Sequence, residues 1–183
     1  MASENLQSVL HAVAHTDRVV GHPRSRVWAL FRDIRTWYRE YRFEVVSGPP
    51  YEAAVGLMEG QTLKVTGSKG LPRAYTGDAL GPEYYLQKNI KVTPENEIVV
   101  VLSGSAYDWT RYTAFYVWRL AEHTRDTLIS IDSYVEAHLF RPLPTSEWSR
   151  YLEELEKNWH RSWSEALSAL EAVLAQRPRA PGY

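Results

Sequence analysis

Cysteine is absent from the 183-residue chain, and its absence excludes several kinds of site at once. Without thiols there is no disulfide framework, no thiolate metal site and no cysteine nucleophile. An excess of one charge is also lacking, because 21 Lys and Arg stand against 22 Asp and Glu, for a formal net charge of −1. With no basic block along the chain, the charge pattern does not predict binding to nucleic acid or to an acidic membrane.

Long hydrophobic runs are missing as well. No stretch approaches the length of about 18 apolar residues that a transmembrane helix needs, and residues 1–7 lack the basic start and apolar core of a secretion signal. We therefore expect a cytoplasmic protein without a transmembrane segment. The length fits one domain over residues 1–183, with frayed tails at residues 1–10 and 177–183.

Aromatic residues are abundant, with seven Trp and twelve Tyr. Each of these side chains buries a large apolar area and carries one polar atom. Such residues suit the wall of a cavity, and they suit an ordinary core equally well.

The clearest local pattern is a long helix over residues 144–176. No Gly or Pro interrupts it after its start, Ser146 is a candidate N-cap, and Arg177-Pro178 stands where a helix would end. At about 1.5 Å per residue the helix is about 45 Å long and needs a broad partner. Its apolar residues recur at steps of three and four and form one stripe: Trp148, Tyr151, Leu152, Leu155, Trp159, Trp163, Ala166, Leu167, Leu170, Val173 and Leu174.

The rest of the chain reads mainly as strands. A first strand over about residues 12–20 is followed by two short helices, one after Pro23 and one through Trp37 to Tyr41. Further strands are predicted at residues 43–47, 57–66, 84–92, 97–103, 110–120 and 127–139. Residues 67–83 are rich in Gly and Pro, which leaves two alternatives open, a lid over a cavity or a strand that the pattern hides.

Several short motifs resemble one family. They are His22-Pro23 followed by Val27-Trp28, then Asp33 and Trp37-Tyr38, then the run from Glu44 to Gly48, Gly56, and Trp118 before the final hairpin. This order resembles the START-like, or SRPBCC, superfamily, which includes polyketide cyclase/dehydratase and Bet v 1-like proteins. The resemblance implies an α+β helix-grip fold, in which a curved antiparallel sheet of six to seven strands wraps around the long C-terminal helix. The hairpin at residues 122–127 departs from the Gly-Gly-Thr turn of many relatives.

Alternation along the strands predicts which side chains face the helix. On the last strand the inward set is Ile129, Ile131, Ser133, Val135 and Ala137. On the strand before it the inward set is Tyr112, Ala114, Tyr116, Trp118 and Leu120. On the strand at residues 84–92 the inward set is Tyr84, Leu86, Ile90 and Val92, and this register carries Lys88 inward with them.

Few residues suggest chemistry. Asp132, Glu136 and His138 share the side of the last strand assigned to water, and their spacing is too wide for a shared proton. His11 and His15 cannot meet on a strand, so no metal site is expected, and no nucleophile motif is present. Lys88 is the exception, because burial would lower its pKa and make it a candidate base.

We expect the chain to bind a small hydrophobic molecule, aromatic or lipid-like, in a cavity between sheet and helix. No cofactor is expected. The alternative is a cofactor-free cyclase or dehydratase acting on a polyketide-like or aromatic substrate, with Lys88 or Tyr116 moving protons. A third reading, an interaction module, would need a patch formed by Tyr134 and residues 107–109. The predicted ligand-binding residues are Trp37, Tyr41, Leu63, Tyr84, Lys88, Tyr112, Tyr116, Trp118, Ser133, Trp159 and Trp163.

Overall fold

The structure, a computed structural model, describes residues 6–39, 41–67, 84–104, 110–140, 142 and 144–176. Its strands form one seven-stranded antiparallel sheet in the order β1-β7-β6-β5-β4-β3-β2. The elements in chain order are β1 (Ser8–Val20), α1 (Arg24–Phe31), α2 (Ile34–Trp37), β2 (Tyr41–Ser47), β3 (Thr62–Gly67), β4 (Tyr85–Thr93), β5 (Glu97–Gly104), β6 (Thr110–His123), β7 (Asp126–Leu139) and α3 (Thr145–Gln176).

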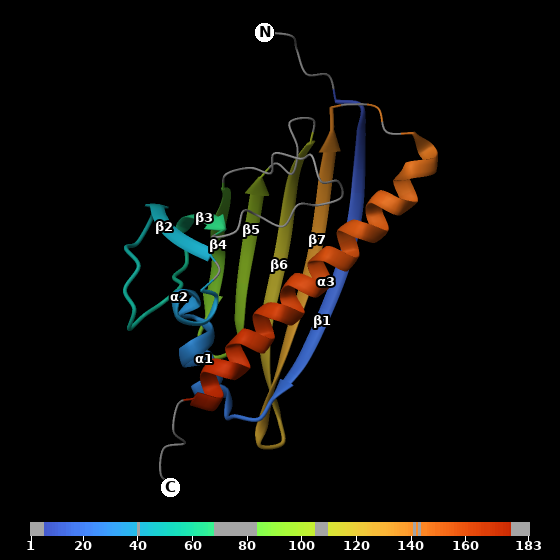
Figure 1. Ribbon diagram of the computed structural model, residues 1–183. Helices are drawn as coiled ribbons and strands as arrows, with labels where there is room; N and C mark the ends of the chain where they lie inside the picture. The colour runs from blue at the N-terminus through green and yellow to red at the C-terminus, as the bar shows by residue number, and fades with distance from the viewer. Residues whose placement is uncertain are drawn as a thin grey trace, which may run out of the picture.

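The long helix α3 runs diagonally across one face of the curved sheet (Figure 1). Polar contacts hold it along β1, where Arg18 Nη1 donates to Glu171 Oε2 at 2.8 Å and Thr16 Oγ1 shares a hydrogen bond with His160 Nδ1 at 3.0 Å. Near the end of the helix, Arg26 of α1 donates to the carbonyl oxygen of Leu174. These contacts fix the helix over the inner face of the sheet, and they confirm the predicted helix-grip architecture.

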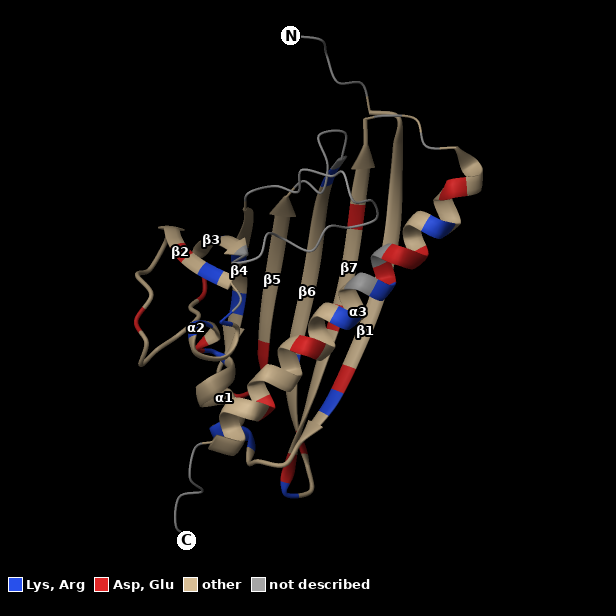
Figure 2. Cartoon of the chain, in the orientation of Figure 1, with Lys and Arg blue, Asp and Glu red and all other residues tan. Residues whose placement is uncertain are grey.

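The predicted apolar stripe of α3 faces the sheet. Charged residues of both signs are interspersed along the helix (Figure 2), as expected for its exposed side. One detail differs from the prediction: the helix begins at Thr145, so Ser146 lies inside its first turn and is not the N-cap. The buried members of the stripe are Tyr151, Trp163, Ala166, Leu167, Leu170 and Leu174.

Several boundaries differ from the prediction. The second short helix covers Ile34–Trp37 and not Trp37 to Tyr41, because Tyr41 already begins β2. The largest differences among the strands are at the starts of β1 and β3. β1 begins at Ser8, which pairs with Leu139 of β7, so residues 8–10 belong to the sheet and are not a frayed tail. β3 begins only at Thr62, because residues 57–61 turn before the strand. In that connection Gly56 has a φ of 75°. A Cβ there would lie 2.4 Å from the carbonyl oxygen of Arg32, so the position excludes larger residues.

Strand register is correctly predicted for β6 and β7 and wrong for β4. On β7 the residues from Ile129 to Ala137 alternate between buried and more exposed as expected. On β4 a bulge between Asn89 and Lys91 shifts the pairing with β5, and such a bulge reverses the alternation beyond it. Val92 therefore packs on the core as predicted, whereas Tyr84, Leu86, Lys88 and Ile90 are exposed.

Candidate functional site

The inner face of the sheet combines a row of small residues with large rings on either side. Across the central strands, Ala12 pairs with Val135, which pairs with Ala114. The flanking positions on β6 are Tyr112 and Tyr116, two residues away in each direction. Because small side chains stand between the tyrosines, their rings have room to meet α3.

Four edge-to-face contacts join β6 to α3. Tyr116 lies 5.5 Å from Trp159 and 5.3 Å from Trp163, centroid to centroid, and Trp163 also lies 5.3 Å from Trp118. Tyr112 lies 6.2 Å from Trp159. The contacts follow from two periodicities, because residues two apart share a strand face and residues four apart share a helix face.

A second set of rings connects the two short helices to β4. Phe31 contacts Trp118 at 5.6 Å and Trp37 at 5.7 Å. From Trp37 the contacts continue through Tyr38 and Tyr41 to Tyr85. Tyr85 and Tyr112 then flank Gly104. The two sets of rings thus meet at Gly104, and together they are here named the aromatic circuit: Phe31, Trp37, Tyr38, Tyr41, Tyr85, Tyr112, Trp159, Tyr116, Trp163 and Trp118.

In the described residues, five of the six buried side-chain polar atoms without partners lie on or beside the aromatic circuit, and the sixth is Arg24 Nε. Within the described part of the chain, no hydrogen-bond partner is found for Tyr116 Oη, Trp118 Nε1, Ser133 Oγ, Trp159 Nε1 and Trp163 Nε1. Ser133 pairs directly with Tyr116 across β7 and β6. Tyr116 and Trp118 are each 1% exposed, Ser133 is 0% exposed and Trp163 is 7% exposed. Leaving such a group unpaired costs about 1–3 kcal/mol, so this clustering is a candidate binding feature.

A neighbouring tryptophan shows the ordinary arrangement. Trp37 Nε1 donates to the carbonyl oxygen of Phe31 at 3.0 Å. Trp37 is as deeply buried as Trp118 and belongs to the same circuit. The unpaired indole groups are therefore a property of their positions and not of buried tryptophan in general.

The tyrosines of the circuit are held in their neutral form. Burial, followed by the nearby Tyr112 and Tyr38, raises the pKa of Tyr116 well above its ordinary value. Burial likewise raises the pKa of Tyr85 and of Tyr112. A neutral phenol can donate or accept a hydrogen bond, and with a raised pKa it does not lose its proton to become a base.

The buried polar residues in the described ranges are all uncharged. They are Thr16, Gln61, Gln87, Asn89, Thr127 and Ser133.

Most of the predicted ligand residues lie in this interior. Trp37, Leu63, Tyr116, Trp118, Ser133 and Trp163 are buried. Tyr41, Tyr112 and Trp159 are partly buried and pack on the same core.

Two predicted residues lie elsewhere, because the β4 register is reversed. Tyr84 is 44% exposed, and its ring lies under the Lys64 ammonium at 4.6 Å. Lys88 is also exposed, so the predicted buried amine is wrong. The lid prediction for residues 67–83 falls outside the described residues, apart from Gly67 at the end of β3.

The inward side of β4 carries amides that the sequence reading missed. Asn89 Nδ2 donates to the Met58 carbonyl oxygen at 3.2 Å and to Gln61 Oε1 at 3.3 Å, and Gln87 Nε2 donates to Asn89 Oδ1 at 3.0 Å. Gln61 Nε2 in turn donates to Pro49 O. This network fastens the connection before β3 to the sheet. The sequence did contain a signal for it, because Gln87 and Asn89 are two residues apart and therefore share one face of the strand.

The outer face of the sheet carries ion pairs. His15 Nδ1 contacts Asp132 at 2.7 Å, its Nε2 contacts Asp17 at 2.8 Å, and Arg119 also binds Asp132. Hydrogen bonds to Asp17 and then to Asp132 raise the pKa of His15. Among the described residues, no group of three or more His, Asp or Glu could hold a metal ion. Asp132 lies on this partly solvated side of β7, as predicted. Glu136 and His138 share that side, but the expectation that their spacing keeps them apart is wrong, because His138 Nε2 lies 2.5 Å from Glu136 Oε1.

Tyr134 also lies on this outer face. It stands between Val13 and Phe115 in one row across three strands, and all three are exposed. Residues 107–109, the other half of the predicted patch, lie outside the described ranges.

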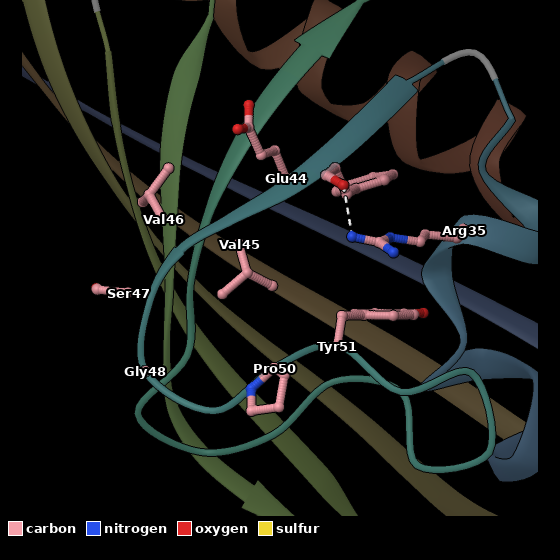
Figure 3. Close-up of a pocket in the computed structure, with 9 residues that line it drawn as sticks. Arg35, Glu44, Val45, Val46, Ser47, Gly48, Pro50 and Tyr51 are labelled. Atoms are coloured by element: carbon pink, nitrogen blue, oxygen red, sulfur yellow. Dashed lines mark hydrogen bonds between the residues drawn. The ribbon is translucent and has the colours of Figure 1, made fainter.

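A separate open groove of about 570 Å³ runs beside β2. Figure 3 shows the Arg35 guanidinium between the Tyr51 ring and the backbone of β2. It lies 4.0 Å from the ring centroid and donates to Phe43 O at 2.7 Å. Tyr51 donates to Asp33 at 2.7 Å. Because these polar groups are already paired within the protein, the groove is a weaker candidate than the interior.

Comparisons with known proteins bear on the fold. No protein-family model and no curated protein matches the chain. Among solved structures, it is similar to an uncharacterised protein from Rhizobium leguminosarum, with 14% identity and a TM-score of 0.60 over 93% of this chain and 98% of that one. It is similar to Ara h 8.0201, with 14% identity and a TM-score of 0.59 over 92% of this chain and 100% of that one. It is also similar to truncated norcoclaurine synthase from Thalictrum flavum, with 16% identity and a TM-score of 0.58 over 95% of this chain and 99% of that one.

The described helices add one negative finding: none is long and apolar enough to cross a membrane. The sheet order, the long helix across its inner face and the three similar structures agree with one another. The chain therefore has a helix-grip fold, which it shares with these solved structures.

Proposed function

We propose that the chain binds a small, largely hydrophobic molecule between the inner face of the sheet and α3. The observation that carries the proposal is the cluster of five buried polar atoms without partners on Tyr116, Trp118, Ser133, Trp159 and Trp163. Ligand sites are typically apolar with a few convergent polar groups. A bound molecule would supply the partners that the described residues do not.

The second candidate is a cofactor-free cyclase or dehydratase that acts on a polyketide-like or aromatic substrate in the same interior. It is favoured by the similarity to norcoclaurine synthase, which has been solved with dopamine and hydroxybenzaldehyde, at 18% identity and a TM-score of 0.55. The described interior offers a donor for such chemistry in Tyr116. It offers no buried carboxylate, imidazole or amine to act as a base, which favours the binding protein.

Nile red, a neutral hydrophobic dye, tests the binding proposal. We expect saturable binding of one dye per chain, with energy transfer from tryptophan. Ala114→Val adds volume on the inner face, where residue 114 is fully buried, and should weaken binding by roughly tenfold. Ala121→Val is the matched control, because it adds the same volume at an exposed position of β6. Equal effects of the two changes, or no saturable binding, would contradict the proposal.

Purified protein also offers a direct search for its ligand. Native mass spectrometry, followed by solvent extraction, would show a bound small molecule and its mass. To separate binder from enzyme, Tyr116→Phe should reduce turnover by about 100-fold or more if Tyr116 is a catalytic acid. In a binding protein the same change removes one hydrogen bond and alters affinity by about tenfold or less.

A further inference from the structure

We infer that the interior selects an uncharged, flat molecule that carries hydrogen-bond acceptors, such as a quinone or an aromatic ketone. Its oxygens would accept from the indole N–H groups of Trp118, Trp159 and Trp163. This inference rests on the proposed function and names the chemical class of the ligand.

Hydrogen-bond direction is the first argument. An indole N–H can only donate, and three such groups are buried without partners in the described residues. Tyr116 and Ser133 add two hydroxyls, which can also donate. A ligand that offers only donors would leave the indole groups unpaired, whereas one with carbonyl or ether oxygens satisfies them.

The positions of the donors favour acceptors on more than one side of the ligand. Trp159 and Trp163 are four residues apart on α3, which separates them by roughly 6 Å along the helix. Trp118 faces Trp163 from β6 at 5.3 Å between ring centroids. Two carbonyl oxygens on opposite sides of a ring suit donors spread in this way, and a flat ring suits contact with aromatic edges and faces.

Charge is the third argument. The buried polar residues of the described ranges are neutral, so an ammonium or carboxylate group on the ligand would be buried without a counter-ion. Burial of an unpaired charge is strongly unfavourable. Charged analogues of the same ring should therefore bind more weakly than the uncharged ring.

The competing explanation is that the indole N–H groups point at neighbouring ring faces. Edge-to-face geometry occurs at Trp118–Trp163 and Tyr116–Trp159, and N–H groups form weak bonds to aromatic faces. In that case the cluster is part of an ordinary packed core. The protein would then bind a ligand with hydrogen-bond acceptors no more tightly than a plain hydrocarbon.

A matched set of probes separates the two explanations: para-naphthoquinone, naphthalene, naphthoate and naphthylmethylammonium. Because the chain has no cysteine, the quinone meets no thiol. We expect naphthoquinone to bind at least about tenfold more tightly than naphthalene, and both charged probes to bind more weakly than naphthalene. In protein with ¹⁵N-labelled indoles, the quinone should shift the N–H signals of Trp118, Trp159 and Trp163 downfield relative to naphthalene. Trp37, already bonded to Phe31, is the internal control.

Variants provide the second arm. Trp163→Phe keeps a ring and removes one donor, so it should lower the affinity for naphthoquinone more than the affinity for naphthalene. Trp148→Phe, near the start of α3, should change neither affinity. If Trp163→Phe does not fold, the indole shifts of the unaltered protein decide the matter. Equal affinity for quinone and naphthalene would overturn this inference and leave the proposed function standing. Failure of both to bind would overturn both.

Discussion

Tyr112 takes up the space beside Gly104 that a side chain would fill. A Cβ at residue 104 would lie 2.9 Å from the Tyr112 hydroxyl oxygen and 3.1 Å from the Cβ of Tyr85. Gly104 pairs with Tyr112 across β5 and β6. The missing side chain therefore leaves room for Tyr112 of β6 and Tyr85 of β4 on either side of Gly104.

Gly104→Ala should destabilise the protein by about 1–3 kcal/mol, because the added methyl group forces the Tyr112 ring to move. Urea unfolding would measure the change. Tyr112→Phe removes the atom nearest to the new methyl group. The double variant should therefore lose less stability than the sum of the two single variants. Simple additivity would show that the ring has room to adjust.

The reversed register of β4 can be tested at two adjacent residues. Asn89→Ala removes a buried amide and leaves Gln61 and Gln87 short of partners, at an expected cost of about 3 kcal/mol. Lys88→Ala alters an exposed side chain and should change stability by no more than about 0.5 kcal/mol. Chemical denaturation of both variants checks the pair. A larger loss at residue 88 would restore the register predicted from sequence.

His15 should make stability depend on pH. Its carboxylate partners Asp17 and Asp132 raise its pKa in the folded protein. Its contribution is therefore fully present below the unfolded value of about 6.5 and is lost as pH rises through the higher folded value. His15→Gln should cost more stability at about pH 5.5 than at about pH 8.5, as measured by urea unfolding at each pH.

Asp132→Asn is the companion variant for this pH effect. It removes one of the two carboxylates at His15 and also weakens the contact with Arg119. The pH dependence assigned to His15 should then become smaller without disappearing, because Asp17 remains. A pH profile that does not change in either variant would show that the imidazole is not held between the carboxylates in solution.

Sequence alone was sufficient where one periodicity extends without interruption. The stripe of α3 and the alternation from Ile129 to Ala137 on β7 each follow a regular pattern, so the inward face of each element could be predicted. On β4 the apolar residues Leu86 and Ile90 suggested the wrong face. A bulge beyond Asn89 shifts the register, and the buried amides are stabilised by Met58 and Gln61, which are distant in sequence.

The sequence predicted which residues lie in the candidate site, but not which of their polar atoms lack hydrogen-bond partners. Tyr116, Trp118 and Ser133 follow from strand alternation, and Trp159 and Trp163 follow from helix periodicity. Which of their polar atoms are paired depends on contacts between elements. The difference between Trp37, bonded to Phe31, and Trp118, without a partner in the described residues, could not be derived from either pattern.

Tyr116→Phe tests whether its hydroxyl serves a ligand or the fold. Since Tyr116 Oη is buried with no partner in the described ranges, its removal from ligand-free protein should leave stability unchanged or raise it by up to about 1–3 kcal/mol. Tyr51→Phe is the control: it deletes a hydroxyl that donates to Asp33 at 2.7 Å, and should cost about 1–2 kcal/mol.

Binding should show the opposite order for the two variants. Tyr116→Phe should lower the affinity for naphthoquinone by roughly threefold to tenfold. Tyr51→Phe should leave that affinity unchanged, because Tyr51 lies in the separate groove beside β2. Urea unfolding and probe titration of the same samples measure both quantities. If Tyr116→Phe destabilises the ligand-free protein as much as Tyr51→Phe does, the hydroxyl is already paired in solution and is a structural group.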